Sequence, residues 1–322
     1  MIRLPNKDRV IFDLPLRVVD MIKEYQETGA LVILTNAEGI CLSSAKFYPV
    51  LDYLCDNFSI DKTKVTIITN NVEESHPVYK ISVQGNHWIT NCKPIFNYNL
   101  DTKSRDLKHV GCFLGKANWH RLILSSWLHT NYLDKTMITM HYDPSSERHR
   151  LDCDMTDINI MAPSELESVV QFIKHCPVTL EEGFLNYTIG PPTHYNIIHQ
   201  YKNIFADVVV ETYVSGMSFF PTEKTLRPII SQTPFIIMGP SGYLSNLKRM
   251  GFKTFDRWWN EDYDNYSDYS RLCRIKSVLE YIFSLSNNQL QDLLNDMQET
   301  LEYNRKHLQK IDNLTVKLNE QR

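Results

Sequence analysis

Short apolar runs, each followed by a polar loop and a segment with helical spacing, constrain the fold of this chain most. Residues 30–35 read Ala-Leu-Val-Ile-Leu-Thr, and the segment that continues to Phe58 has apolar side chains three and four residues apart. Residues 65–69 form a second apolar run. A continuous apolar run of this length predicts a parallel strand that is buried on both faces. Strand, helix and strand in succession therefore predict a β-α-β unit in an open, mostly parallel sheet.

The same alternation recurs further along the chain. The next unit has a predicted strand at 110–115, a helix from His120 to Leu133 and a strand at 137–141. In the second half the expected elements are helix 164–175, helix 195–205, strand 206–211, helix 223–231 and strand 234–238.

A polar stretch, residues 144–157, separates the two sets of elements. The chain has 322 residues, which is more than one hydrophobic core usually organises. We therefore predict an α/β fold with two Rossmann-like domains, residues 1–150 and 151–285, that face a cleft. In such folds ligands bind at the carboxyl ends of the strands.

The tail, residues 286–322, predicts a long helix. From Asn288 onward it has no Pro or Gly, and an apolar stripe follows helical spacing through Leu290, Leu294, Met297, Leu301, Leu308, Ile311 and Leu318. Asn304 and Thr315 occupy the same stripe. We favour a helix packed along the protein, and the alternative is an exposed coiled-coil arm, over 288–322, that forms a homo-oligomer.

The composition is that of a globular protein, with 43% hydrophobic and 22% charged residues. No apolar run reaches the roughly 18 residues that span a bilayer, and the first nine residues contain no apolar core of a signal peptide. We therefore expect a cytoplasmic protein. A formal net charge of -4 lowers the expectation of nucleic-acid binding, but it leaves room for a local basic patch.

The seven cysteines are scattered, and no pair has the Cys-x-x-Cys spacing. Because zinc needs clustered ligands and cytosolic thiols stay reduced, we interpret them as reduced packing residues.

Residues 206–255 contain the most informative local pattern. Glu211 stands at the carboxyl end of a predicted buried strand, and Thr222 is placed to cap the next helix. The N-terminus of a helix offers free N–H groups and a positive dipole end to anions. Lys224 would add a charge for phosphate, and the carboxylate of Glu223 could accept both hydroxyls of a ribose. The alternative is that Glu223 and Lys224 are a solvated surface pair.

A turn follows the next predicted strand. Residues 239–242 read Gly-Pro-Ser-Gly, and a helix is expected from Tyr243. Gly239 and Gly242 would let the backbone approach a ligand closely, with Ser241 beside them. Together with the helix start at Glu223, this turn would hold a nucleotide diphosphate. The alternative is that the glycines merely turn the chain, because Gly-x-x-Gly alone is a weak signal.

The combination resembles a known donor-site motif. Residues 219–225 read Phe-Phe-Pro-Thr-Glu-Lys-Thr, and residues 234–242 read Pro-Phe-Ile-Ile-Met-Gly-Pro-Ser-Gly. With Glu211 before them and Leu-Lys-Arg-Met-Gly-Phe-Lys-Thr-Phe after them at 247–255, they resemble the α-1,3-fucosyltransferase family and related bacterial and viral glycosyltransferases of GT-B architecture. The resemblance covers about 45 residues.

What the resemblance implies is a set of roles in the donor site. Glu223 would bind the donor ribose, Lys224 its phosphates, and Glu211 would support the loop or the sugar. That family usually has Glu-Asn-Ser where this chain has Glu-Thr-Tyr at 211–213, so fucose itself is not the expected sugar.

A second resemblance lies at residues 113–122, Phe-Leu-Gly-Lys-Ala-Asn-Trp-His-Arg-Leu. Relatives often have a strand, a basic loop and then His-Arg at the start of a helix. Lys116 and Arg121 would then neutralise the leaving diphosphate. The alternative is an ordinary loop lysine and a first-turn arginine.

An inverting transfer needs a base that takes the proton of the acceptor hydroxyl. Glu38, in the loop after the first buried strand, is the first candidate, and Asp143 is the second. Either can also be an ordinary loop carboxylate. The histidines His76, His87 and His194 are expected to be structural or exposed. A retaining mechanism remains open, because the motif describes donor binding and not stereochemistry.

Two acidic segments offer further interpretations. Asp152-Cys-Asp154 has the Asp-x-Asp spacing by which other glycosyltransferases bind a divalent metal, but it follows a charged linker, and Asp262-Tyr-Asp264 repeats the spacing. We therefore predict no metal site. Residues 255–271 combine aromatic and acidic side chains, which suits either a sugar-facing loop or packing between domains.

The sequence thus favours a metal-independent glycosyltransferase without a cofactor, which moves a sugar from a nucleotide-diphosphate donor to a glycan hydroxyl. A narrower alternative is the glycosylation of hydroxymethylated bases in viral DNA, which would need a basic face and a flipped base. An alternative of another class is a non-catalytic α/β scaffold that assembles through 288–322. No Gly-x-x-x-x-Gly-Lys-Ser/Thr string supports a P-loop nucleotidase.

Overall fold

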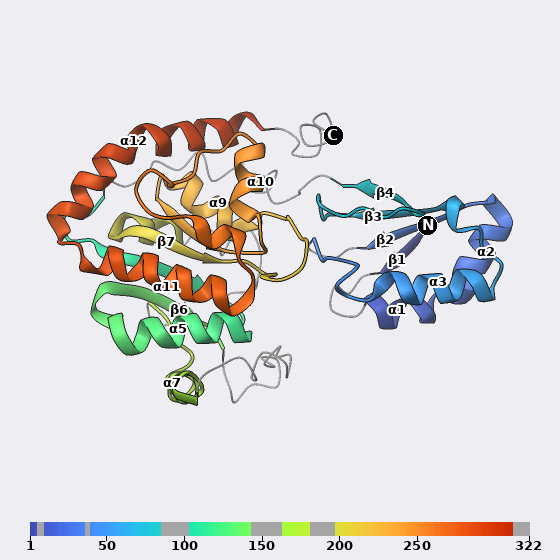
Figure 1. The fold of residues 1–322 in the computed structure, drawn as a ribbon, viewed down its shortest axis with the longest axis horizontal. Coiled ribbons are helices and arrows are strands. Elements are labelled where there is room, and N and C mark those ends of the chain that lie inside the picture. The colour runs from blue at the N-terminus through green and yellow to red at the C-terminus, as the bar shows by residue number, and fades with distance from the viewer. Residues whose placement is uncertain (5–9, 36–38, 85–102, 143–162, 181–196, 312–322) are drawn as a thin grey trace. The chain divides into compact units, whose positions relative to one another are not determined.

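A computed structural model describes residues 1–4, 10–35, 39–84, 103–142, 163–180 and 197–311 of the chain (Figure 1). It is a mixed α/β structure with two parallel sheets of four strands each. The chain divides into two compact units. The first unit comprises residues 1–87, 215–221 and 312–322, and the second comprises residues 88–214 and 222–311.

The sheet of the first unit has the strand order β1-β2-β3-β4, and every neighbouring pair is parallel. Its strands are β1 (Ile2–Leu4), β2 (Leu31–Thr35), β3 (Val65–Thr69) and β4 (Lys80–Val83). Its helices are α1 (Val10–Leu16), α2 (Val18–Thr28) and α3 (Phe47–Asn57). The side chains of Ile33, Ile67 and Leu51 are fully buried in one core, so the sheet stabilises this unit by packing against the helices.

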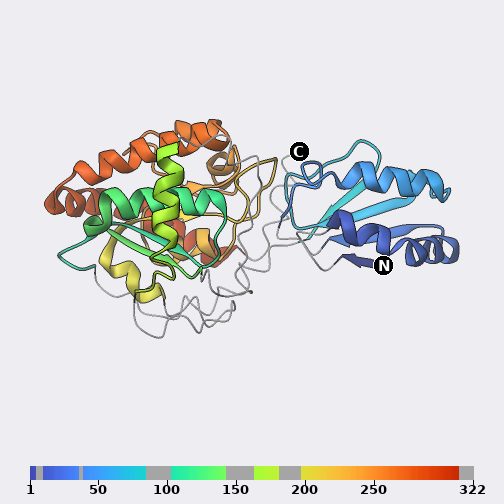
Figure 2. The same ribbon diagram turned by 90° about the horizontal axis from the view of Figure 1, so that it is seen from below.

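The sheet of the second unit has the order β6-β5-β7-β8, again parallel throughout. Its strands are β5 (Lys108–Leu114), β6 (Thr136–Met140), β7 (Ile204–Val210) and β8 (Phe235–Met238). Its helices are α5 (Trp119–Tyr132), α7 (Pro163–Ile173), α9 (Glu223–Ile230), α10 (Tyr243–Arg249), α11 (Asp268–Ser284) and α12 (Asn287–Lys310). All seven residues of β7 are buried, as expected of a central strand that is covered on both faces. Figure 2 shows α7 lying across α5, with which it packs.

The predicted domain boundary at residue 150 is wrong. β5 and β6 were assigned to the first domain, but β5 pairs with β7 in the register Val110↔Ala206 and so belongs to the sheet of the second unit. The division between the units falls after residue 87. The polar stretch 144–157 lies outside the described residues, and the elements on both sides of it belong to the second unit.

Residues 215–221 belong to the first unit, although they follow β7 in sequence. Their backbone is held by Asn71, whose side chain accepts a hydrogen bond from Phe219 N at 2.9 Å and donates one to Met217 O at 2.9 Å. Val72 N donates to Phe219 O at 3.3 Å. Gly39 has a φ of +67°, and a Cβ there would meet the side chain of Phe220. Residues 215–221, part of the connection between β7 and α9, are therefore built into the first unit.

The apolar stripe of the tail is buried within the second unit over the helix that is described. Leu290, Leu294, Met297 and Leu301 of α12 are buried, and the helix packs against α9 and β7. Asn304 joins the stripe because its side chain bonds to both the N and the O of Lys253, each at 2.8 Å. Over residues 287–310 the helix thus packs along the protein, while residues 312–322 lie outside the described residues. Within the described part of the chain, no helix combines the length and the apolar composition that crossing a membrane requires.

Candidate functional site

The order of the strands marks one place in the second sheet for a ligand. β5 is followed by α5 and by β6 on one side, whereas β7 is followed by α9 and by β8 on the other side. The carboxyl ends of the neighbouring strands β5 and β7 thus form a topological switch point, where open α/β sheets bind their ligands. The helices α5 and α9 both begin after these two strand ends.

Glu211 follows β7 directly and is only 2% exposed. Its carboxylate accepts hydrogen bonds from Thr222 N (3.1 Å), Thr222 Oγ1 (2.7 Å), Thr225 Oγ1 (2.7 Å) and Tyr243 OH (3.0 Å). Burial, followed by the charge of Glu211, raises the pKa of Tyr243 well above its ordinary value. Of the two roles predicted for Glu211, these contacts describe support of the loop: it joins the end of β7 to the starts of α9 and α10.

The first turn of α9 brings together the side chains that are predicted to bind the ribose and the phosphates. The Thr222 hydroxyl caps the helix by accepting from Lys224 N at 3.3 Å. Lys224 Nζ also donates to that hydroxyl at 3.0 Å and lies 2.9 Å from Glu223 Oε1. The two charged side chains are only 16% (Glu223) and 14% (Lys224) exposed, which differs from the solvated surface pair of the alternative interpretation. A carboxylate and an ammonium are therefore held, half-buried, at a helix N-terminus.

Arg121 links the two strand ends at the switch point. It is 4% exposed, and its guanidinium donates to Lys116 O (3.2 Å), Val210 O (3.3 Å) and Glu211 O (3.2 Å). The side chain of Lys116 is exposed in the loop between β5 and α5. Arg121 thus fixes the backbone at the end of β7, and a diphosphate would have to share its donors with these carbonyl groups.

His120 is a member of this site that the sequence did not single out. Its ring hydrogen-bonds to the backbone of Glu211, and its Nε2 is buried without a hydrogen-bond partner in the described chain. Burial first, and then the charge of Arg121, lowers the pKa of His120 to about 3, so the imidazole is neutral at pH 7. The available signal was its position beside Arg121 at the start of a helix. A buried polar atom without a partner is costly, and a ligand that supplies the partner removes that cost.

The turn at Gly239, Ser241 and Gly242 follows β8 as predicted, and Gly242 adopts a left-handed φ of +78°. The N–H groups of Leu244 and Ser245 at the start of α10 donate to the carboxylate of Asp264 at 2.9 and 3.0 Å.

Two further contacts explain the composition of that turn. Ser241 Oγ donates to Asp264 O at 3.1 Å. A Cβ at Gly239 would come within 2.7 Å of the ring of Tyr243, so this glycine is needed for packing. The anion at this helix start is the protein's own carboxylate, a contact that the sequence did not predict.

The other candidate residues are distributed as follows. Glu38 and Asp143 lie outside the described residues, and so do His87, His194, Asp152 and Asp154. His76 packs between the rings of Tyr48 and Tyr79, at 4.2 and 4.7 Å, and its Nδ1 bonds to the backbone N of Val78 and Tyr79, which is a structural role. In the described ranges, no three His, Cys, Asp or Glu side chains are placed to hold a metal ion.

Asp207 of β7 and Lys103 belong to a cluster of buried charged groups. Asp207 accepts from Tyr201 OH at 2.6 Å, while its Oδ1 has no partner among the residues that are described. Burial raises the pKa of Asp207 to about 6. Burial also lowers the pKa of Lys103 to about 7, and its Nζ donates to Tyr201 O, Ile204 O and Thr233 Oγ1. Lys103 thereby connects the segment before β5 to the segments that lead into β7 and β8.

The aromatic and acidic segment 255–271 packs largely against its own unit. The carboxylate of Glu261 accepts from Thr254 Oγ1 at 2.6 Å and from Phe255 N at 2.7 Å. The ring of Phe255 lies 5.3 Å from that of Trp259. Comparison of the chain with protein-family models and with curated proteins found no match.

Proposed function

We propose that the protein is a glycosyltransferase and that its second unit binds a nucleotide-diphosphate sugar at the carboxyl ends of β5 and β7. The observation that carries the proposal is the half-buried pair of Glu223 and Lys224 at the N-terminus of α9, beside the switch point of the sheet. The finer assignment to the GT-B architecture, with the first unit on the acceptor side, is part of the same proposal.

The chemistry of these groups fits the two halves of a nucleotide diphosphate. The carboxylate of Glu223 has acceptor capacity for two vicinal ribose hydroxyls. The ammonium of Lys224 and the dipole of α9 would attract the diphosphate. His120 would add an acceptor for a donor hydroxyl, since the one N–H of its neutral ring bonds to the backbone of Glu211 and leaves Nε2 as a lone pair. Lys224 and the dipole of α9 would stabilise the charge that develops on the departing diphosphate.

The proposed transfer is a direct displacement with inversion. An acceptor hydroxyl oxygen forms a bond to the anomeric carbon while the bond from that carbon to the diphosphate oxygen breaks. The hydroxyl proton goes to a carboxylate, for which Glu38 and then Asp143 are our candidates. We propose a glycan hydroxyl as the acceptor and catalysis without a metal, so activity should persist in EDTA.

Nucleotide binding tests the donor site directly. UDP, GDP and CDP are each added to the full chain, and the one that binds should raise the melting temperature by about 5 to 10 °C at a hundred times its Kd. Glu223→Ala and Lys224→Ala should each weaken this nucleotide by about tenfold to a hundredfold, because each removes a charge-assisted hydrogen bond. Glu302→Ala is the matched control, since it breaks an exposed Glu–Lys pair on α12.

Turnover gives the second measurement. Many transferases hydrolyse their own donor slowly, so a panel of nucleotide sugars is incubated with the protein and the release of free nucleotide is measured. The proposal fails if none of the three nucleotides shifts the melting temperature, or if both variants turn over the donor as fast as the parent protein does.

A further inference from the structure

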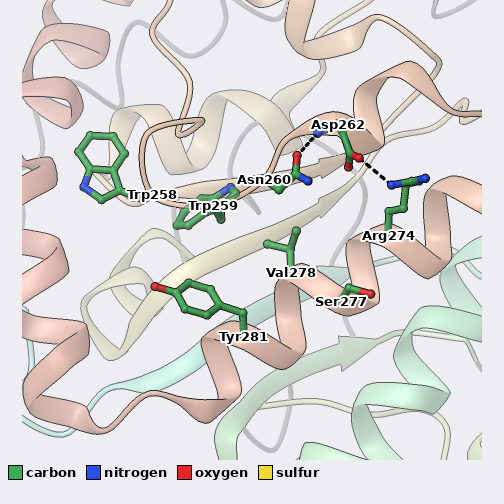
Figure 3. A pocket seen from close by; sticks show the side chains of 8 residues that line it. All are labelled: Trp258, Trp259, Asn260, Asp262, Arg274, Ser277, Val278 and Tyr281. Carbon is green, nitrogen blue, oxygen red and sulfur yellow. Dashed lines mark hydrogen bonds and ion pairs between the residues drawn. The ribbon is translucent and has the colours of Figure 1, made fainter.

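A pocket of about 380 Å³ lies in the second unit between the loop at 258–262 and α11 (Figure 3). The residues that line it include none of those that surround Glu211 or the first turn of α9. Its size falls at the lower end of the range of small-molecule sites in proteins. The donor site proposed above does not account for it.

One side of the pocket is aromatic. Trp258, Trp259 and Tyr281 contribute their rings, as Figure 3 shows. The ring of Trp258 is fixed because its Nε1 donates to Asp296 at 2.5 Å and the guanidinium of Arg257 lies over it. Tyr281, near the end of α11, is 43% exposed. The fixed ring of Trp258 offers a rigid apolar surface, to which the exposed ring of Tyr281 adds a second ring.

The other side carries a polar set with no net charge. Asp262 pairs with Arg274 at 2.6 Å, and the backbone N of Asp262 donates to Asn260 Oδ1 at 2.8 Å. Arg274 is held further by the ring of Tyr266, whose centre lies 3.7 Å from the guanidinium carbon. The set therefore presents a carboxylate acceptor next to guanidinium and amide donors, in fixed positions.

We infer that this pocket binds a neutral saccharide ring. A pyranose has a C–H face that packs on an aromatic ring, and its rim carries hydroxyl groups that each donate and accept hydrogen bonds. Asp262 would accept from hydroxyls, while Arg274 and Asn260 would donate to them.

This inference goes beyond the proposed transferase activity and does not depend on it. It assigns the second unit a saccharide site that shares no residue with the Glu223–Lys224 pair. Such a site would hold a glycan chain to the protein whether or not the donor site transfers a sugar.

Titration with methyl glycosides of glucose, galactose, mannose and fucose tests the inference, with tryptophan fluorescence of the full chain as the signal. We expect a saturable change with at least one glycoside at millimolar concentration, since Trp258 and Trp259 line the pocket. Tyr281→Ala should weaken the binding about threefold to tenfold, and Asp262→Asn about tenfold or more. Tyr53→Ala, which removes a ring that is 66% exposed in the first unit, should leave it unchanged.

Three outcomes overturn the inference. The first is that no glycoside gives a saturable change, and the second is that binding is the same in Tyr281→Ala and Asp262→Asn as in the parent. The third is that Glu223→Ala abolishes saccharide binding, because the sugar would then occupy the donor site. Failure of nucleotide binding leaves this inference standing, so the two proposals are tested separately.

Discussion

The substitution Glu211→Gln measures how much the buried carboxylate after β7 contributes to the stability of the second unit. One oxygen of Glu211 accepts from Thr222 N, Thr225 Oγ1 and Tyr243 OH, and the other accepts from Thr222 Oγ1. Glutamine can keep its oxygen in the first position, but its NH₂ group then faces the Thr222 hydroxyl. That hydroxyl already accepts from N and Nζ of Lys224, so both of its lone pairs are in use.

The magnitude follows from these contacts. The variant loses one hydrogen bond to a charged group, which contributes about 1.5 to 3 kcal/mol, and it buries an amide donor without an acceptor, at a cost of about 1 to 3 kcal/mol. Relief from burying the charge offsets part of this loss. We therefore expect the free energy of unfolding of the second unit to fall by about 2 to 4 kcal/mol.

Urea unfolding followed by tryptophan fluorescence is the assay, because all five tryptophans fall in the residue ranges of the second unit. Glu302→Gln, on the exposed face of α12, is the control and should change the free energy by less than about 0.5 kcal/mol. If Glu211→Gln changes it as little as the control does, the bonds around Glu211 do not hold the site in shape, and the reasoning is refuted.

Further predictions concern the core and the start of α10. Asn304→Leu should lower the free energy of unfolding by about 1 to 3 kcal/mol, because it removes the two partly buried hydrogen bonds between the Asn304 side chain and the N and O of Lys253, and urea unfolding measures this. The pKa of Asp207 is raised from 3.8 to about 6, so the folded state holds a proton that the unfolded state has lost between about pH 4 and 6. Stability should therefore fall by about 3 kcal/mol as the pH rises through that window, and unfolding curves of Asp207→Asn across it should show no such fall. Asp264→Ala should reduce the melting temperature, since it removes the carboxylate that caps α10 at a typical cost of about 1 kcal/mol.

Six of the eight described strands could be predicted because each of these six is a short apolar run. Strands at 30–35, 65–69 and 110–115 were found as β2, β3 and β5, each within two residues. The edge strands β1 and β4 were missed, because three- and four-residue strands with exposed alternate positions carry little apolar signal.

The domain boundary could not be predicted from local pattern. Which strands pair is decided by tertiary contacts, and the register Val110↔Ala206 joins segments that look independent in the sequence. The polar stretch 144–157 indicated a boundary because such stretches often link domains, but it connects elements of the same unit. Residues 215–221 are attached to the first unit by hydrogen bonds between the Asn71 side chain and their backbone, and nothing in the sequence indicates these bonds.

Within the candidate site, the types of the residues were predictable but their partners were not. The local pattern places Thr222 and Lys224 at a helix start, and the resemblance to a donor-site motif adds Glu211 to them; the structure brings the three into contact through the Thr222 hydroxyl. His120 was missed because its significance comes from burial and from a nitrogen that lacks a partner in the described chain, neither of which a sequence displays.

The sequence suggests that the turn after β8 and the start of α9 hold one diphosphate together, and the capping of α10 bears on the share of that turn. Asp264 occupies the N–H groups of Leu244 and Ser245, so a diphosphate at the turn after β8 would have to displace a carboxylate that is already paired. At α9 the cap is an uncharged hydroxyl, and the nearby cation, Lys224, lies within reach of the same helix end. A diphosphate beside Asp264 would meet the like charge of that carboxylate, whereas at the start of α9 it would meet the cation Lys224 together with its partner Glu223. We therefore propose the start of α9 for the diphosphate of a donor, while Gly239 leaves room for the ring of Tyr243, whose hydroxyl donates to Glu211.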